Sequence, residues 1–266
     1  MRISFHATAA IILGAALALG TLQARTALAD CRDLPSHADL QATLDDVVQG
    51  GGNAGLGNEM WGTIVDRDGI VCAVAFTGDD KGDQWPGSRV ISAQKANTAN
   101  AFSLPGDAGF GGALSSGNLY GTVLEQGSLF GLQFSNPVDT GVAYGGPNHS
   151  GGSANRYGQS NDPLVGEFIG GVNVFGGGLA LYDSGGILLG GLGVSGDTSC
   201  TDHIVAWKVR DGLGLDNIPG GVAPDGTDNL ILATPVTPNS FQHPTCGFEE
   251  DPIIEDLPTT FPVGAN

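Results

Sequence analysis

The chain has 266 residues, with 10 basic and 28 acidic side chains and a formal net charge of −18. Nucleic acids and anionic membranes attract Lys and Arg, so this charge argues against both as partners. The 45 glycines follow no three-residue period, which excludes collagen, and apolar segments interrupt them, which excludes simple disorder. The composition indicates one soluble, acidic, glycine-rich domain with decorations.

The first 29 residues have the three parts of a secretory signal peptide. Arg2 gives a positive start, residues 9–19 read AAIILGAALAL, and residues 27–29 read ALA, which offers a signal peptidase the small side chains it requires. The apolar stretch is shorter than the roughly 20 residues of a membrane-spanning helix. We therefore expect export to the periplasm or the extracellular space, no membrane insertion, and a mature chain that begins at Asp30.

Four cysteines follow the signal, namely Cys31, Cys72, Cys200 and Cys246. An even number in an exported chain predicts two disulfides, for which three pairings are possible. We favour Cys31–Cys72 and Cys200–Cys246, because each bond would then tie one end of the chain to the core. Close C-x-x-C pairs are absent from the sequence, which argues against a zinc site and against thioredoxin-like chemistry.

Hydrophobic periodicity predicts three helices and two hairpins. The helices span 38–48, 88–103 and 199–213, and the hairpins pair strands 61–65 with 70–76 and 178–182 with 187–194. Because the strands arrive as hairpins, the expected fold is an α/β domain of the α+β type. Its single antiparallel sheet is built from two hairpins with helices packed on it.

The intervening and final segments have weaker patterns. Residues 105–171 are rich in glycine, serine and asparagine, with apolar pieces at 119–124 and 129–134 and a predicted surface loop at 144–162. Beyond Gly220 the chain is acidic and proline-rich without a clear helical period. The predicted organisation is a signal peptide at 1–29, a domain at 30–217 with an insertion at about 105–171, and an extended tail at 218–266.

Residues 191–196 spell G-x-G-x-x-G between a predicted strand and a predicted helix. In a dinucleotide-binding fold this pattern opens a parallel βαβ unit, with an acidic residue about 20 positions later at the end of the next strand. Here the strand belongs to a hairpin and no second strand follows. We interpret the glycines as allowing a tight passage from strand to helix and close packing.

Two patterns resemble serine-enzyme sites. Ser92 begins S-x-x-K, but the companion motifs S-D-N and K-T-G are both absent. Ser195, Asp197 and His203 have the residue types of a catalytic triad, yet no G-x-S-x-G elbow surrounds Ser195. We therefore expect neither serine to act as a nucleophile.

The start of the last helix has two predicted features. Ser199 and Asp202 form an S-x-x-D pattern that predicts a capping box. The histidines after the signal (His37, His149, His203 and His243) include no H-x-x-x-H pair, so a dedicated metal cage is not predicted. A single histidine can still ligate a haem iron, and His203 follows a glycine-rich strand that a flat ligand could approach closely.

Two groups of residues together resemble one family. Lys95-Ala96 followed by Thr98-Ala99 is similar to the K-A-x-T-A helix motif of the GlcG/HbpS family, the haem-binding or haem-degrading domain. Residues 176–178, 193–196 and Asp202 resemble that family's G-G-G…G-V-S-G…D block. The resemblance covers roughly residues 38–104 and 172–213.

The resemblance implies a small profilin-like fold, assembly into a homo-oligomer, and, in secreted members, haem binding linked to redox or haem sensing. The chain departs from the family in its long insertion and its added tail, and in Leu179-Ala180, where a proline commonly follows the glycine run. We single out Lys95, Asp202 and His203 as ligand-binding residues, with His203 as the axial ligand of haem.

Our leading hypothesis is therefore an exported protein that binds haem or another small ligand. The alternatives are a structural or interaction oligomer without a ligand, and an enzyme that acts on a small hydroxy acid or on haem. No catalytic constellation is evident in the sequence, so an enzymatic activity is left open.

Overall fold

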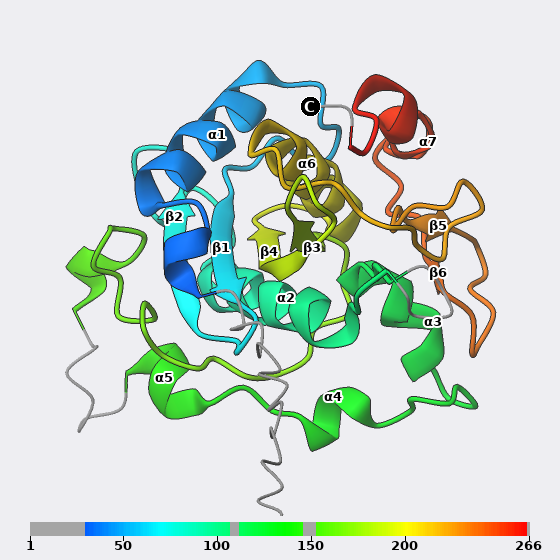
Figure 1. Ribbon diagram of the computed structural model, residues 1–266, viewed down its shortest axis with the longest axis horizontal. Coiled ribbons are helices and arrows are strands. Elements are labelled where there is room, and N and C mark those ends of the chain that lie inside the picture. The colour runs from blue at the N-terminus through cyan, green and yellow to red at the C-terminus, as the bar shows by residue number, and fades with distance from the viewer. Residues whose placement is uncertain (1–29, 107–111, 146–152, 265–266) are drawn as a thin grey trace, which may run out of the picture.

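The computed structural model describes residues 30–106, 112–145 and 153–264. Its centre is a four-stranded antiparallel sheet in the order β2-β1-β4-β3 (Figure 1). The predicted signal peptide and His149 lie outside the described residues. The strands are β1 (Trp61–Asp66), β2 (Val71–Phe76), β3 (Gly178–Tyr182) and β4 (Leu188–Ser195).

The sheet consists of two hairpins placed side by side. β1 pairs with β2 and β3 pairs with β4, and the hairpins are joined by the antiparallel pair β1–β4, in which Trp61 lies opposite Ser195. Side chains on both faces of β1, β3 and β4 are buried, because helices cover the sheet on each side. The predicted fold class, an α+β domain with a single antiparallel sheet, is confirmed.

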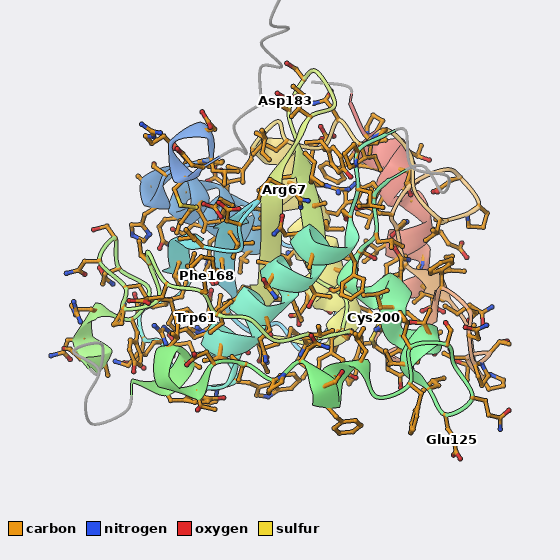
Figure 2. All side chains as sticks on the ribbon, turned by 60° about the horizontal axis from the view of Figure 1, so that its bottom comes forward. Trp61, Arg67, Glu125, Phe168, Asp183 and Cys200 are labelled. Atoms are coloured by element: carbon orange, nitrogen blue, oxygen red, sulfur yellow. A yellow bond between two sulfur atoms is a disulfide. The ribbon has the colours of Figure 1, made fainter. Side chains whose placement is uncertain are left out.

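Helices form a layer on each face of the sheet. α2 (Ser88–Phe102) crosses one face and contacts β4, β1 and β3, as Figure 2 shows from the side on which α2 comes forward. α1 (His37–Gly50) and α6 (Ser199–Gly212) cover the other face. Leu40 and Leu44, one turn apart on α1, are fully buried against this second face. The three predicted helices therefore exist, with ends that differ by one or two residues.

The glycines of β4 let α2 lie very close to the sheet. A Cβ atom at Gly191 would collide with the Ala96 carbonyl oxygen, and one at Gly193 would collide with that of Ser92. Only glycine fits where two backbones approach this closely. The packing interpretation of G-x-G-x-x-G is thus supported, and the strand is antiparallel, unlike that of a dinucleotide-binding unit.

The insertion at 105–171 contains short helices within its described parts. They lie along the α2 side of the molecule (Figure 1) and comprise the 3-10 turns Ser116–Leu119 and Ala154–Arg156 together with α3 (Tyr120–Val123), α4 (Leu132–Ser135) and α5 (Thr140–Tyr144). The predicted surface loop at 144–162 ends in Asp162, which is 2% exposed, so this end of the loop is anchored in the core.

The prediction of an extended tail is wrong. The tail contains a short parallel pair, β5 (Ile231–Leu232) with β6 (Gln242–His243), and the helix α7 (Asp251–Thr260). Ile254 and Leu257, three residues apart on α7, are each 1% exposed and belong to the core cluster that contains α6. Burial of this small apolar face explains why a ten-residue, proline-containing segment is helical.

Both predicted disulfides are present. Cys31–Cys72 joins the start of the described chain to β2, and Cys200–Cys246 joins the tail to the first turn of α6. Their Cα–Cα distances are 5.2 and 6.1 Å. In the described part of the chain, no helix combines the length and the apolar character that crossing a bilayer requires.

Candidate functional site

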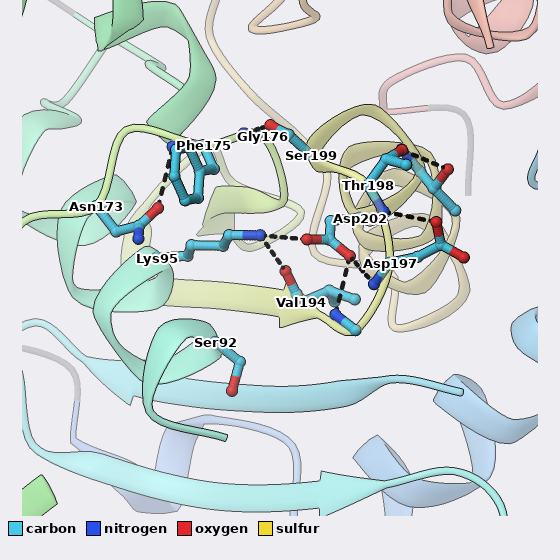
Figure 3. Close-up of polar contacts among 12 residues, drawn as sticks. Ser92, Lys95, Asn173, Phe175, Gly176, Val194, Asp197, Thr198, Ser199 and Asp202 are labelled. Carbon is cyan, nitrogen blue, oxygen red and sulfur yellow. Dashed lines mark hydrogen bonds and ion pairs between the residues drawn. The ribbon is translucent and has the colours of Figure 1, made fainter. Parts of the chain in front are cut away.

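Lys95 and Asp202, the charged residues of the two motifs, form a buried ion pair between α2 and α6 (Figure 3). The Lys95 Nζ atom donates to Asp202 Oδ2 at 2.5 Å and to the Val194 carbonyl oxygen at 3.0 Å. Both side chains are almost wholly buried, at 0% and 3% exposure. The sequence-predicted pair is therefore brought together, although the two residues are 107 positions apart.

The second oxygen of Asp202 holds the turn that leads from β4 into α6. Asp202 Oδ1 accepts hydrogen bonds from the backbone N–H groups of Gly196 and Asp197, at 3.0 and 2.9 Å. The G-V-S-G residues are thus fixed to the helix that follows them. We call the contacts of Lys95, Val194, Gly196, Asp197 and Asp202 the joint, because they connect both helix layers to the end of β4.

Burial sets the protonation behaviour of the joint. It raises the pKa of Asp202 to about 6, against the opposing effects of the Lys95 ammonium and the two backbone N–H donors. Burial also lowers the pKa of Lys95, and the nearby carboxylate opposes this shift. Removing either partner would leave an uncompensated charge in the interior. The joint therefore behaves as a structural connection whose two charges depend on each other.

The predicted capping box of the last helix is wrong. The N-cap of α6 is Thr198, whose side chain accepts from the Thr201 backbone N–H, and Asp202 accepts from Lys95, Gly196 and Asp197 instead of from the Ser199 N–H. Ser199 has a different role: its Oγ accepts from the Gly176 N–H at 2.7 Å and lies 2.7 Å from His243 Nε2. The S-x-x-D spacing was misassigned because a distant lysine competes for the carboxylate.

His203, the predicted axial ligand, is completely buried. Neither ring nitrogen makes a hydrogen bond within the described structure, and the side chain of Asn229, although near, does not meet hydrogen-bond geometry. Burial, followed by the positive charge of Arg210, lowers the pKa of His203 to about 3. Iron could reach this ring only if the surrounding chain moved, so the assignment of His203 as a haem ligand stays a prediction.

The residues of the rejected triad do not act together. The carboxylate of Asp197 accepts from the backbone N–H groups of Leu56 and Asn58, and His203 makes no hydrogen bond. Ser92 is fully buried, with its Oγ 2.8 Å from both Thr63 Oγ1 and the Arg89 carbonyl oxygen. Both arrangements fit the view that neither serine is a nucleophile.

Two further buried ion pairs were not predicted from the sequence. Arg89 of α2 pairs with Asp162 of the insertion, and Arg210 of α6 pairs with Asp228 of the tail, in each case through two hydrogen bonds. The available signal was one arginine in each of the two helices, Arg89 near the start of α2 and Arg210 near the end of α6. The partners of these arginines, Asp162 and Asp228, could not be identified, because both aspartates lie in segments without a periodic pattern.

Residues 52–210 match the sequence family described as haem-degrading, HbpS-like proteins. The chain belongs to this family. The match includes both motifs and ends before the tail. No curated protein matches the chain.

Several solved structures are similar to the chain at low identity. A PduOC:heme complex is 21% identical, with 68% of this chain and 96% of that one covered and a TM-score of 0.43. The ORFY protein of Klebsiella pneumoniae is 18% identical, with coverages of 67% and 90% and a TM-score of 0.42. A double mutant of HbpS from Streptomyces reticuli is 16% identical, with coverages of 79% and 99% and a TM-score of 0.39.

Proposed function

We propose that this protein is exported and binds haem, in haem or redox sensing or in haem scavenging. The observation that carries the proposal is the match to the HbpS-like family over residues 52–210, with Lys95 and Asp202 of its motifs paired at the centre of the fold. Members of that family are described as haem-degrading proteins. A bound haem would supply a redox-active iron, and the protein would supply an enclosed site and contacts to the porphyrin.

The motif residues fit haem poorly as direct ligands. Lys95 and Asp202 are buried and engaged with each other, and His203 is closed off from solvent. A porphyrin needs an apolar slot that is open to the ligand. The joint therefore stabilises the fold around the haem site. The residues that contact haem should lie on an exposed surface or in an open cleft.

Export is supported by the two disulfides. Such bonds form and persist in oxidising compartments and are rare in the cytosol. The signal-like sequence at 1–29 agrees with this location. Cleavage after Ala29 would be visible in the intact mass of the secreted protein, which should begin at Asp30.

A haemin titration of the purified mature protein tests the proposed function. We expect a saturable Soret shift with defined stoichiometry. His203→Ala, His37→Ala and His243→Ala should be titrated in parallel, since loss in the His203 variant alone would support that residue as the ligand. A Soret change that rises linearly without saturation would contradict specific binding.

A homo-oligomer is the second candidate function, and one surface favours it. Phe130 and Phe134, in the insertion near α4, are 63% and 86% exposed. Large exposed apolar side chains that lie close together are typical of interaction surfaces. Light scattering should then give a mass above one chain, which falls in a Phe130→Ser, Phe134→Ser variant. An unchanged mass in that variant would exclude this surface as the contact.

A further inference from the structure

A cleft opens on the α2 side of the molecule, between the start of α2 and the insertion. It has a volume of about 360 Å³, within the usual range for small-molecule sites. Its lining comes from β1, the loop before α2, the start of α2 and the insertion, namely Trp61, residues 80–82, Pro86, Gly87, Arg89, Val90, Ala143, Tyr144 and Tyr157. All of these residues lie in the part of the chain that the structure describes, and none of them belongs to the joint.

Trp61 is the buried part of the cleft and has an unused hydrogen-bond donor. Its side chain is 2% exposed, and its Nε1 atom is buried without a hydrogen-bond partner. The Nε1 atom is itself closed off from solvent, so a ligand could reach it only if the cleft wall moved, and a ligand in the cleft meets the exposed edge of the indole instead. The indole ring packs at 5.0 Å from the ring of Phe76, so its position is fixed before a ligand arrives.

Arg89 organises the part of the cleft formed by Tyr157. It is 4% exposed, its guanidinium is paired with Asp162, and it lies 3.8 Å from the centre of the Tyr157 ring. The ion pair fixes the guanidinium, and the guanidinium in turn fixes the aromatic ring through a cation–π contact. The cleft thus has two pre-positioned aromatic residues, Trp61 and Tyr157, which suit a flat aromatic ligand.

Charge at the mouth of the cleft differs from that of the whole protein. Lys81 and Asp80 both line it, and Arg89 is matched by Asp162, so the cleft is close to neutral in a chain of net charge −18. A ligand with carboxylate groups would be repelled by most of this surface. Here the lining has no excess of negative charge, because Lys81 lies beside Asp80 and Arg89 is paired with Asp162.

We propose that this cleft binds a planar aromatic ligand that carries carboxylate groups, namely the haem of the proposed function on which this inference rests. Tyr157 and the exposed edge of Trp61 contact the ring, and Lys81 binds a carboxylate. Among the described lining residues there is no histidine, cysteine or methionine, and the phenol oxygens of Tyr144 and Tyr157 are of the type that ligates haem iron in catalase.

The test uses surface substitutions that leave the core intact. Lys81→Glu should weaken haemin binding about fivefold at low salt, because it reverses a charge at the mouth. Arg32→Glu, whose side chain is 88% exposed and does not line the cleft, is the control for charge reversal and should leave the affinity unchanged. Tyr144→Phe and Tyr157→Phe keep the rings and remove the hydroxyls, so one of them should shift the Soret maximum.

A second ligand separates failure of this site from failure of the proposed function. Protoporphyrin IX has the ring and carboxylates without iron, and the Lys81→Glu variant should weaken its binding as well, measured by quenching of tryptophan fluorescence. If haemin binds saturably, is unaffected by Lys81→Glu and both tyrosine variants, and is lost in His203→Ala, the cleft is the wrong site and the haem function stands. If protoporphyrin binds through Lys81 and haemin shows no saturable Soret shift, the cleft stands and the haem function fails.

Discussion

The joint and the cleft are built on the same helix, and each contains a buried cation of α2 paired with a distant aspartate. Lys95 pairs with Asp202 of α6, and Arg89, six residues earlier, pairs with Asp162 of the insertion. The first pair is enclosed on all sides. The second lies beside an open cleft and orders one of its aromatic walls. The motif residues thus maintain the fold, and the insertion supplies one part of the accessible cleft.

The chemistry of the two cations explains the difference. An ammonium group is compact, and Lys95 is served by one carboxylate and one carbonyl oxygen. A guanidinium is planar, so Arg89 binds Asp162 with its edge and presents its face to Tyr157. The ion pair of the arginine therefore also fixes the position of a neighbouring aromatic ring, whereas that of the lysine does not.

The largest expected effect comes from breaking the joint. Lys95→Met should lower the free energy of unfolding by about 3–5 kcal/mol, because it leaves the Asp202 carboxylate buried without its countercharge. Urea unfolding followed by circular dichroism would measure it. The double variant Lys95→Met, Asp202→Asn removes both charges and should recover part of the loss. A loss below about 1 kcal/mol in the single variant would contradict a structural role.

Removing either disulfide should have the next largest effect. The bonds close loops with sequence separations of 41 and 46 residues, for which the chain-entropy model gives about 4 kcal/mol each. Cys200→Ala with Cys246→Ala should therefore cost about as much as Cys31→Ala with Cys72→Ala. If Cys200–Cys246 costs much more, the tail contributes to the stability of α6 beyond the entropy of the crosslink. An intact mass matching four free thiols would exclude both bonds.

The free energy of unfolding should decrease as the pH falls below 6.5, because two histidines are buried in their neutral form. Burial lowers the pKa of His203 to about 3 and that of His243 to about 4, from an unperturbed value of 6.5. Below pH 6.5 the unfolded state therefore binds more protons, so stability is fully present above that pH and is lost towards pH 4. Asp202 works in the opposite direction, because its raised pKa makes the folded state bind a proton as the pH falls through about 6.

The net loss between pH 6 and pH 5 should be on the order of 1–2 kcal/mol. Urea midpoints at these two pH values would measure it, and His243→Gln should reduce the slope. A stability that stays constant from pH 7 to pH 5 would contradict the enclosed state of both histidines.

The elements that sequence analysis predicted correctly are those fixed by local information. Leu40 and Leu44 at helical spacing marked α1, the turn at 66–69 marked the first hairpin, and an even cysteine count indicated the disulfides. The helix α7 was missed because Pro252 and Pro258 obscure the spacing of Ile254 and Leu257, and only burial against the core stabilises it.

The missed parts of the site depend on contacts between distant segments. The carboxylate of Asp202 has the spacing of a capping residue and is drawn away by a lysine 107 positions earlier. Trp61 has the pattern of a core residue of β1, and only the position of the insertion leaves a cleft beside it. Local periodicity contains no information about which segment will cover a strand, so the cleft could not be predicted.

The smallest expected effect is at Ser92, which lies on α2 between Arg89 and Lys95. Its hydroxyl is buried beside Thr63 and bonded to the Arg89 carbonyl oxygen, so Ser92→Ala should cost about 1 kcal/mol, the net contribution of one such hydrogen bond. Because the hydroxyl is fully buried and the nearby lysine is engaged with Asp202, we expect no covalent labelling by a β-lactam or fluorophosphonate probe. Labelling that disappears in Ser92→Ala would show that the helix opens and that the serine is reactive. Unchanged haemin affinity in the same variant is expected as well, since Ser92 lines neither the cleft nor the ion pair of the joint.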